Sequence, residues 1–521
     1  MASLDPKVCY QALLTRDARF DGRLFVGVTS TGIYCRPVCP ARTPRAEHCR
    51  FFVSAAAAQA AGFRPCLRCR PETAPEQGAW RGTSNSVSRG LALIAAGALD
   101  GHESKVEKLA ERLGMGERQL RRLFEQHLGA SPIAVAQTRR VLFAKQLIHE
   151  TRLPMSEIAL AAGFGSVRRF NEAFQTLFKR APSELRRKAV VSLPQGSAGA
   201  AGVSLRLRYR APYDWRSLLE HLRARAIAGI ERVDEARAGF PGKYLRSVRE
   251  AGEFGTIEVQ HLPEQHSLAA TVRIGRVELL PSIVERIRHL FDVSADTTLI
   301  EAQLGRDAWL APLVAARPGL RVAGGWDGFE LGVRAVLGQQ VSVGAARQLG
   351  ERLVRLCGSP VLLGPSLTRV FPSAAEVAAA DLSTLGMPAS RRQTLLSLAR
   401  AALADPELFE PSQSVEHTVA RLVAVLASAN GPLSISRSVP PASPTPSLPA
   451  TGVSCAAPPA LLAPRSTPVL SNGAQSAGAR GAPMRHSTSG QPTARSAKMR
   501  SARRALESKG VSHDRNVPRT A

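Results

Sequence analysis

Residues 35–69 read CRPVCPARTPRAEHCRFFVSAAAAQAAGFRPCLRC, and this stretch decides how the first part of the chain folds. It holds a C-x3-C pair and a C-x2-C pair with 26 residues between them, formed by Cys35, Cys39, Cys66 and Cys69. Two closely spaced cysteine pairs are the usual way to close a tetrahedral thiolate site around zinc. The spacing therefore predicts one structural Zn²⁺ with four thiolate ligands. Unligated core cysteines are the alternative, and Cys49 is a competing ligand.

The composition suggests several domains and a polyanionic partner. A chain of 521 residues suggests about three or four domains. Lys plus Arg number 69 and Asp plus Glu number 42, a net charge of +27, which favours nucleic acid over membrane as the partner. The sequence has no apolar run of the ~18 residues that a transmembrane helix needs, and no signal peptide. We therefore expect a cytoplasmic protein with reduced cysteines and no membrane partner.

The residues around the cysteines point to a specific chemistry. VTSTGIYCRPVCPARTPRAEHCRFF, followed by AAGFRPCLRC, resembles the zinc domain of the Ada-type methylated-DNA repair regulators. The resemblance implies that all four cysteines bind zinc and that Cys35 takes a methyl group from a DNA methylphosphotriester. Zinc keeps the sulfur ionised, and only the thiolate is a competent nucleophile. The thioether product does not regenerate, so the reaction is stoichiometric.

Charge and flanking arginines suggest how this chemistry could affect DNA binding. Zinc with four thiolates is formally −2 and repels phosphate, whereas methylating one sulfur leaves −1. The reduced repulsion is worth on the order of 1 kcal/mol near a surface. Four arginines flank the cysteines and are expected to hold phosphates, with simple solvation weighted equally: Arg36, Arg42, Arg45 and Arg68.

The next segment has a repeated helical pattern. Residues 105–127 keep a helical apolar period that Gly114 and Gly116 interrupt, and residues 155–178 repeat the layout. The region 86–188 resembles the AraC-type DNA-binding domain, which implies that two second helices enter successive major grooves. An αα-hairpin without a DNA role is the alternative. The matching DNA-contact candidates are Arg118, Gln119, Arg121 and Arg122, then Ser166, Arg168, Arg169 and Asn171.

A third segment, 203–428, combines strand patterns with a long helical stretch. APYDW (211–215), FELGVRAVLGQQVSV (329–343) and DLSTLGMPASRRQTL (381–395) resemble bacterial DNA-3-methyladenine glycosylase II, of the helix-hairpin-helix superfamily. Members flip an alkylated purine into an aromatic cleft and cleave its glycosidic bond with the help of an aspartate. The resemblance makes Gln339 and Gln340 the DNA wedge candidates. Tyr213 and Trp215 are cleft candidates, with core packing as an equal alternative.

The family pattern stops after residue 426. A glycine-rich hairpin such as LPGIGPWTA, whose N–H groups would hold a phosphate, and then the catalytic Asp should follow. The chain instead reads ASANGPLSISRSVPPASPTP, and the only acidic residues beyond 430 are Glu507 and Asp514. The segment 431–521 has no Phe, Tyr or Trp, so we expect it to be disordered. A frameshift near codons 427–431 would explain the break, and we expect little glycosylase activity.

The sequence thus predicts a multidomain, mainly α protein with α+β modules. Its expected parts are a small zinc-bound α/β domain, a tandem helix-turn-helix, an antiparallel-sheet α+β domain, an incomplete helical glycosylase domain and a disordered tail, over 1–80, 86–188, 203–318, 319–430 and 431–521. The favoured function is a response to DNA alkylation: a stoichiometric methyl acceptor that regulates transcription. Double-stranded DNA is the expected partner, with RNA polymerase as a further candidate and the nucleoid as the place of action. The alternatives are an active alkylbase glycosylase and a non-enzymatic zinc-containing AraC-type regulator.

Overall fold

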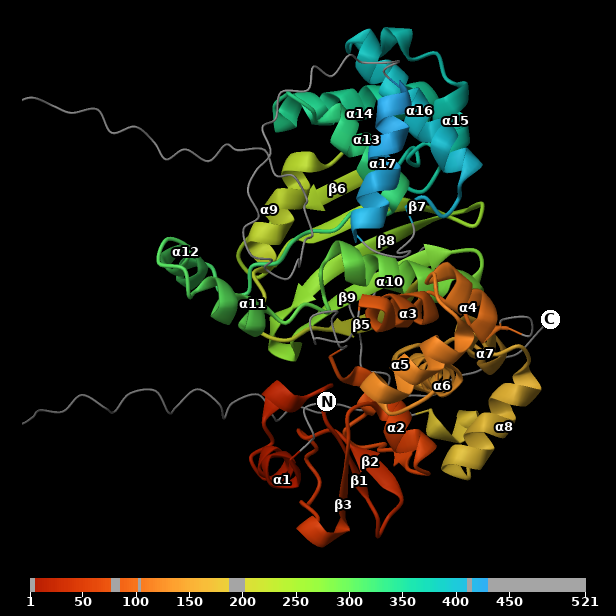
Figure 1. Cartoon of the computed structure of the whole chain (residues 1–521), viewed down its shortest axis with the longest axis vertical. Coiled ribbons are helices and arrows are strands. Elements are labelled where there is room, and N and C mark those ends of the chain that lie inside the picture. The colour runs from red at the N-terminus through yellow and green to blue at the C-terminus, as the bar shows by residue number, and fades with distance from the viewer. Residues whose placement is uncertain (1–4, 76–84, 102–104, 187–201, 410–414, 430–521) are drawn as a thin grey trace, which may run out of the picture. The chain divides into compact units, whose positions relative to one another are not determined.

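The computed structural model describes residues 5–75, 85–101, 105–186, 202–409 and 415–429. Within these ranges it confirms the expected fold class: a small sheet that carries the cysteines, a helical segment, a larger antiparallel sheet and a second helical segment (Figure 1). The segment 431–521, expected to be disordered, lies outside the described residues. Among the described helices, none is both long enough and apolar enough to cross a bilayer.

The first module is a four-stranded sheet with the order β3-β1-β2-β4. β1 pairs antiparallel with β2 and β3, whereas β2 and β4 run parallel. Helix α2, capped by the Ser54 side chain, contacts this sheet and buries Ala56, Ala57 and Ala58. The elements are α1 (Pro6–Leu14), β1 (Phe25–Val28), β2 (Ile33–Cys35), β3 (Cys49–Phe52), α2 (Ala55–Ala60) and β4 (Arg64–Pro65).

The second module is helical and contains the two expected helix-turn-helix units. The first turn falls at the predicted Gly114 and the second at Gly163, and their φ angles of +68° and +82° disfavour other residues. Each second helix buries one apolar stripe and exposes the opposite face. The helices are α3 (Asn85–Ala95), α4 (Val106–Arg112), α5 (Glu117–Leu128), α6 (Pro132–Glu150), α7 (Met155–Ala161) and α8 (Val167–Phe178).

The third module contains a five-stranded antiparallel sheet with the order β5-β9-β8-β7-β6. Helices α9 and α10 bury apolar faces that belong to the same hydrophobic core as the inner residues of the sheet. The bounds are β5 (Val203–Arg208), α9 (Trp215–Arg225), β6 (Glu231–Asp234), β7 (Lys243–Glu250), β8 (Glu253–Leu262), β9 (Ser267–Ile274) and α10 (Leu280–Leu290).

A run of helices follows the sheet, as expected. Helices α13, α14, α16 and α17 lie together (Figure 1), with a separate core built around Val333, Leu353, Leu395 and Leu398. On α17, Val419 and Val423 remain more than half exposed. The bounds are α11 (Thr297–Leu304), α12 (Ala311–Ala316), α13 (Gly328–Leu337), α14 (Val343–Cys357), α15 (Ala374–Ala379), α16 (Ala389–Ala404) and α17 (Val415–Ala429).

Candidate metal centre and nucleic-acid interface

The four predicted cysteines meet at one point of the first module. Their sulfur atoms all lie within 4.8 Å of one another. A tetrahedral zinc with bonds of about 2.3 Å separates its sulfur ligands by about 3.8 Å, so the cluster fits one Zn²⁺ with four thiolate ligands. Across the described ranges, no other group of three or more His, Cys, Asp or Glu residues comes close enough to hold a metal.

The parallel pairing of β2 and β4 explains why residues so far apart in sequence meet. Tyr34 lies opposite Pro65 in this pair, so Cys35 and Cys66 follow at the same edge of the sheet. The Cys66 N–H donates to the Tyr34 carbonyl oxygen at 3.0 Å and fixes this register. The short spacings then bring Cys39 and Cys69 into the same cluster.

Backbone N–H groups also stabilise negative charge on the sulfurs. The Arg36 N–H lies 3.4 Å from the Cys69 Sγ, and the Arg68 N–H lies 3.3 Å from the Cys66 Sγ. Without metal, hydrogen bonds with Cys39, Cys66 and Cys69 raise the pKa of Cys35, and a hydrogen bond with Cys35 lowers the pKa of Cys39 to about 7. Four adjacent sulfurs cannot all ionise unless a cation joins them, so the donor set is suited to a divalent metal.

Cys35 differs from the other three cysteines in exposure. Cys39, Cys66 and Cys69 are 6–7% exposed, whereas Cys35 is half-buried at the end of β2. Cys35 is therefore the least buried residue of the four. Cys49 stands outside the cluster, with its thiol directed to the Arg45 carbonyl oxygen at 3.3 Å, and Cys9 is buried in a separate apolar cluster.

The four flanking arginines fall into two groups. The guanidinium of Arg36 is buried, pairs with Asp21 and also donates to the Cys69 carbonyl oxygen and the Thr73 hydroxyl. Its partners are thus internal, which fits a structural role behind the cluster, and its contact with phosphate stays a prediction. The other three, Arg42, Arg45 and Arg68, are exposed, and their contact with phosphate stays a prediction.

The helix-turn-helix candidates lie on the second helix of each unit. On α5, Leu120 and Phe124 face the core, and the four predicted residues Arg118, Gln119, Arg121 and Arg122 are exposed. On α8, the exposed candidates are Arg168, Arg169 and Asn171, whereas Ser166 caps the helix by accepting from the Arg169 N–H at 3.2 Å. Exposure on the predicted face fits DNA contact, which stays a prediction for each of these residues.

The predicted wedge residues occupy a tight turn between α13 and α14. Both Gln339 and Gln340 are exposed, and Gln340 has a φ of +56°, which is unfavourable for a residue with a side chain. Strained backbone of this kind clusters at functional positions. The turn thus presents two amide side chains, with α14 starting at the Ser342 cap directly after it.

The two predicted cleft aromatics belong to the core of the sheet module. The Trp215 indole N–H donates to the Pro241 carbonyl oxygen at 2.7 Å, and its ring stacks between His261 and Phe291. The Tyr213 hydroxyl donates to the Phe291 carbonyl oxygen at 2.6 Å, and Arg321 covers its ring. These contacts match the packing alternative for both residues.

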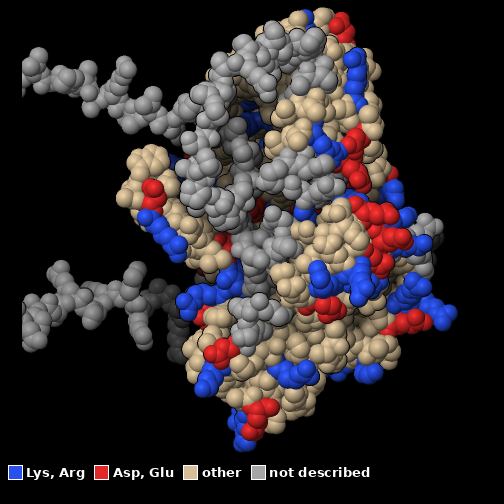
Figure 2. All heavy atoms as spheres, viewed as in Figure 1, with Lys and Arg blue, Asp and Glu red and all other residues tan. Residues whose placement is uncertain are grey.

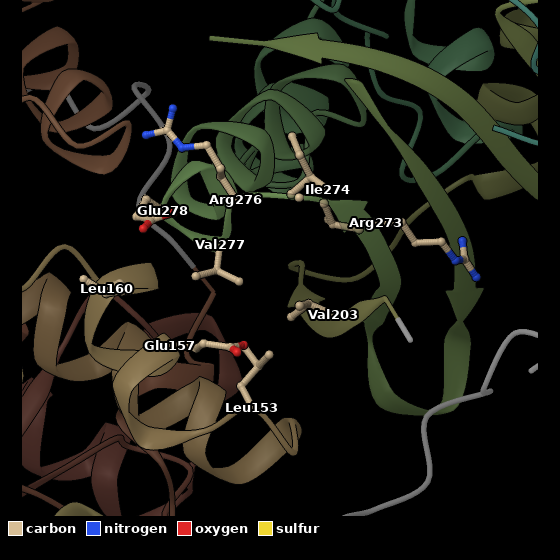
Figure 3. A pocket seen from close by; sticks show the side chains of 11 residues that line it. Leu153, Glu157, Leu160, Val203, Arg273, Ile274, Arg276, Val277 and Glu278 are labelled. Carbon is tan, nitrogen blue, oxygen red and sulfur yellow. The ribbon is translucent and has the colours of Figure 1, made fainter. Parts of the chain in front are cut away.

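A pocket of about 450 Å³ lies away from all these residues, between α7 and the end of β9 (Figure 3). Figure 3 shows Leu153 and Glu157 on one side and Val203 and Ile274 on the other. None of the predicted site residues lines it.

On the face shown in Figure 2, basic and acidic side chains are interspersed, so the net positive charge does not form one uninterrupted patch there.

The sequence reasoning missed a set of buried charges beside the cysteine cluster. Lys145 on α6 is fully buried, and its ammonium group lies 2.7 Å from the Glu72 carboxylate. Burial lowers the pKa of the Lys145 ammonium. Burial alone would raise the pKa of the Glu72 carboxyl, but the positive charges of Lys145 and Arg70 outweigh it and hold that pKa below the usual value. The sequence did carry one signal for this burial: Lys145 follows Val141 by four residues, which places it on the apolar face of a helix.

Three family models match successive parts of the chain: the metal binding domain of Ada at residues 8–72, a helix-turn-helix domain at 109–188 and the AlkA N-terminal domain at 204–327. A protein of Mycobacterium tuberculosis named "Probable bifunctional transcriptional activator/DNA repair enzyme AlkA" is 39% identical over 77% of this chain and 79% of its own length. DNA-3-methyladenine glycosylase 2 of Escherichia coli is 37% identical over 38% of this chain and 66% of its own length. The bifunctional transcriptional activator/DNA repair enzyme Ada of Escherichia coli is 34% identical over 30% of this chain and 42% of its own length.

Proposed function

The chain belongs to the family of bifunctional transcriptional activator/DNA repair enzymes that includes the mycobacterial AlkA protein, and on this premise we propose that Cys35 accepts a methyl group from DNA methylphosphotriesters. The observation that carries the proposal is that four sulfurs meet in one cluster in the described residues and that Cys35 is the least buried of the four residues. The same transfer then strengthens binding of the helix-turn-helix units to DNA.

The transfer is a substitution at the methyl carbon. The Cys35 sulfur donates an electron pair to that carbon, an S–C bond forms, and the bond between the carbon and the phosphotriester oxygen breaks. The electron pair of the broken bond stays on the oxygen and restores an anionic phosphodiester. Zinc, when bound, keeps the sulfur ionised at neutral pH. Cys39, Cys66 and Cys69 hold the cluster together, and Arg42, Arg45 and Arg68 supply positive charge for the DNA backbone.

The regulatory consequence follows from charge. Transfer of a methyl cation removes one unit of negative charge from a centre that faces phosphate, which favours DNA binding by on the order of 1 kcal/mol, about fivefold in affinity. The exposed side chains of α5 and α8 are then the base and phosphate contacts. We expect such an activator to act on the nucleoid and to contact RNA polymerase.

For the third module we propose an inactive glycosylase. The exposed turn at Gln339 and Gln340 resembles a DNA wedge, but beyond residue 430 the sequence supplies only Glu507 and Asp514 as carboxylates, without a glycine-rich hairpin before them. An active alkylbase glycosylase remains the second candidate function, because the chain is 37% identical to a DNA-3-methyladenine glycosylase over 202 residues.

Methyl transfer is tested with duplex DNA that carries isotopically labelled methylphosphotriesters. The zinc-loaded full chain should take up one label per molecule, and Cys35→Ser should take up none. Cys49→Ser is the matched control, because Cys49 is a nearby half-buried cysteine outside the cluster, and it should retain full uptake. Uptake by Cys35→Ser, or no uptake by the unaltered protein, would exclude the proposal.

A further inference from the structure

A chain of buried ionic contacts starts at the cysteine cluster. The Lys145 ammonium donates to the Cys66 carbonyl oxygen at 3.0 Å and to Glu72 at 2.7 Å. Lys145 belongs to α6 in the helical module, whereas Cys66 and Glu72 belong to the cysteine module. The loop that carries two of the four sulfurs is therefore held by a residue of the DNA-binding module.

The contacts continue from Glu72 to the end of α6. The Arg70 guanidinium donates to Glu72 at 2.9 Å and to Glu150, the last residue of α6, at 3.4 Å. Arg70 itself has a φ of +52°, a left-handed backbone conformation that is unfavourable for arginine. Such strain persists only where surrounding contacts hold it, and the two ion pairs of Arg70 are contacts of this kind.

The last contacts reach the sheet of the third module. The Arg206 N–H on β5 donates to Glu150 at 3.0 Å, and the Gln146 amide donates to the Arg206 carbonyl oxygen at 3.0 Å. β5 is an edge strand whose other side pairs with β9. Two side chains of α6 thus form hydrogen bonds with backbone groups on the outer edge of β5, as a neighbouring strand would.

These contacts are made by charged side chains, whose burial costs desolvation free energy. Such groups are explained best if they fix one specific arrangement of the modules. The side chains of Lys145, Glu72 and Glu150 are at most 1% exposed. Buried ion pairs stabilise a fold no better than apolar residues of the same size, and their best attested use is to fix one arrangement of parts. The contacts begin on a metal-ligand loop and run along the helix that joins the two helix-turn-helix units, which is where a fixed arrangement would affect DNA binding.

We propose that Lys145, Glu72, Arg70 and Glu150 form a buried relay that couples the cysteine cluster to α6 and makes β5 of the glycosylase-like sheet a structural part of the methylation sensor. These are positioning residues and do not touch the reacting atoms. The inference rests on the proposed methyl transfer, because it says how the change of charge at the cluster reaches the helices that bind DNA. It gives the third module a function that needs no glycosylase chemistry.

The test is the ratio of DNA affinities after and before methylation, measured by fluorescence anisotropy on the full chain. The double variant Lys145→Met/Glu72→Gln removes both charges of the first pair, so no single buried charge is left behind. We expect zinc content and methyl uptake at Cys35 to stay unchanged, while the ratio falls from about fivefold to below about twofold. Lys7→Met, at an exposed lysine of α1, is the matched control and should keep the full ratio.

A second variant keeps the relay testable if the first one loses zinc. Glu150→Gln changes the far end of the relay and should also lower the ratio, with Glu264→Gln at an exposed position as its control. A full ratio in Glu150→Gln, or in a zinc-loaded double variant, would overturn the relay. Failure of the proposed function is distinguishable, because the unaltered protein would then show no methyl uptake or no change in affinity.

Discussion

The cysteine module and the helical end of the glycosylase-like module both resemble parts of DNA repair proteins, but the sequence predicts that only the first is complete. In the first, four sulfurs from two separated sequence pairs meet within 4.8 Å, and Cys35 is the least buried of the four residues. In the second, helices α13 to α17 and the turn at Gln340 are in place, yet the sequence beyond them lacks the expected hairpin and carboxylate. We propose that the second module has kept the fold without the chemistry, because function has to be argued from the site.

The largest expected effect comes from breaking the complete site. Cys39→Ser removes a buried ligand and should abolish stoichiometric zinc binding and cooperative unfolding of the first module, a loss of several kcal/mol, because structural zinc contributes directly to folding. Zinc analysis and calorimetry of the full chain measure both effects. A variant that keeps one tightly bound zinc would show that three sulfurs suffice and would weaken the four-thiolate account.

The second prediction concerns the incomplete module. The purified chain should release no 3-methyladenine from methylated duplex DNA above the spontaneous rate, because no carboxylate in the expected frame stabilises the cationic sugar. Chromatography of released bases measures this, with an active 3-methyladenine glycosylase as the positive control. Multiple turnovers by this chain would remove the contrast between the two modules.

A smaller effect on stability is expected from Asp292, a buried carboxyl of the third module. Burial raises the pKa of Asp292 to about 6, so the folded state holds this proton more tightly than the unfolded chain. The resulting stability is fully present at low pH and is lost as the pH rises from about 4 through 6. Asp292→Asn should therefore stabilise the protein by about 1–2 kcal/mol at pH 7 and hardly at pH 4.

Thermal unfolding across this pH range measures the Asp292 effect. Glu264→Gln, at an exposed position, is the control and should show no comparable pH dependence. Destabilisation by Asp292→Asn at pH 7 would mean that the ionised carboxylate makes a favourable contact that the protein needs.

The smallest effect concerns the strained turn. Gln340→Gly should raise the stability of the helical end by up to about 1 kcal/mol, because glycine adopts a φ of +56° without steric cost. Denaturant unfolding measures the gain, and Gln339→Gly, one residue earlier with a negative φ, is the matched control that should not stabilise. An equal change in the free energy of unfolding for both variants would show that the backbone at Gln340 is not strained.

The features that the sequence predicted correctly are those that depend on residues close together in the chain. Cysteine spacing and helical periodicity are local, and they predicted the metal cluster and both helix-turn-helix units. The pairing of Arg36 with Asp21 was not predicted, because the two residues are 15 positions apart and a sequence does not show such a pairing. The contacts of Lys145 with Cys66 and of Glu150 with β5 were invisible for the same reason. For Tyr213 and Trp215 the sequence left a cleft and a core equally open, and the packing partners that fit a core come from distant parts of the chain.

Mass spectrometry of the intact zinc-loaded chain, before and after exposure to methylphosphotriester DNA, tests the central claim most directly. We predict one zinc per chain throughout, a gain of one methyl group, and fragment ions that place this group on Cys35. A chain without zinc, or a methyl group on any other residue, would contradict the account.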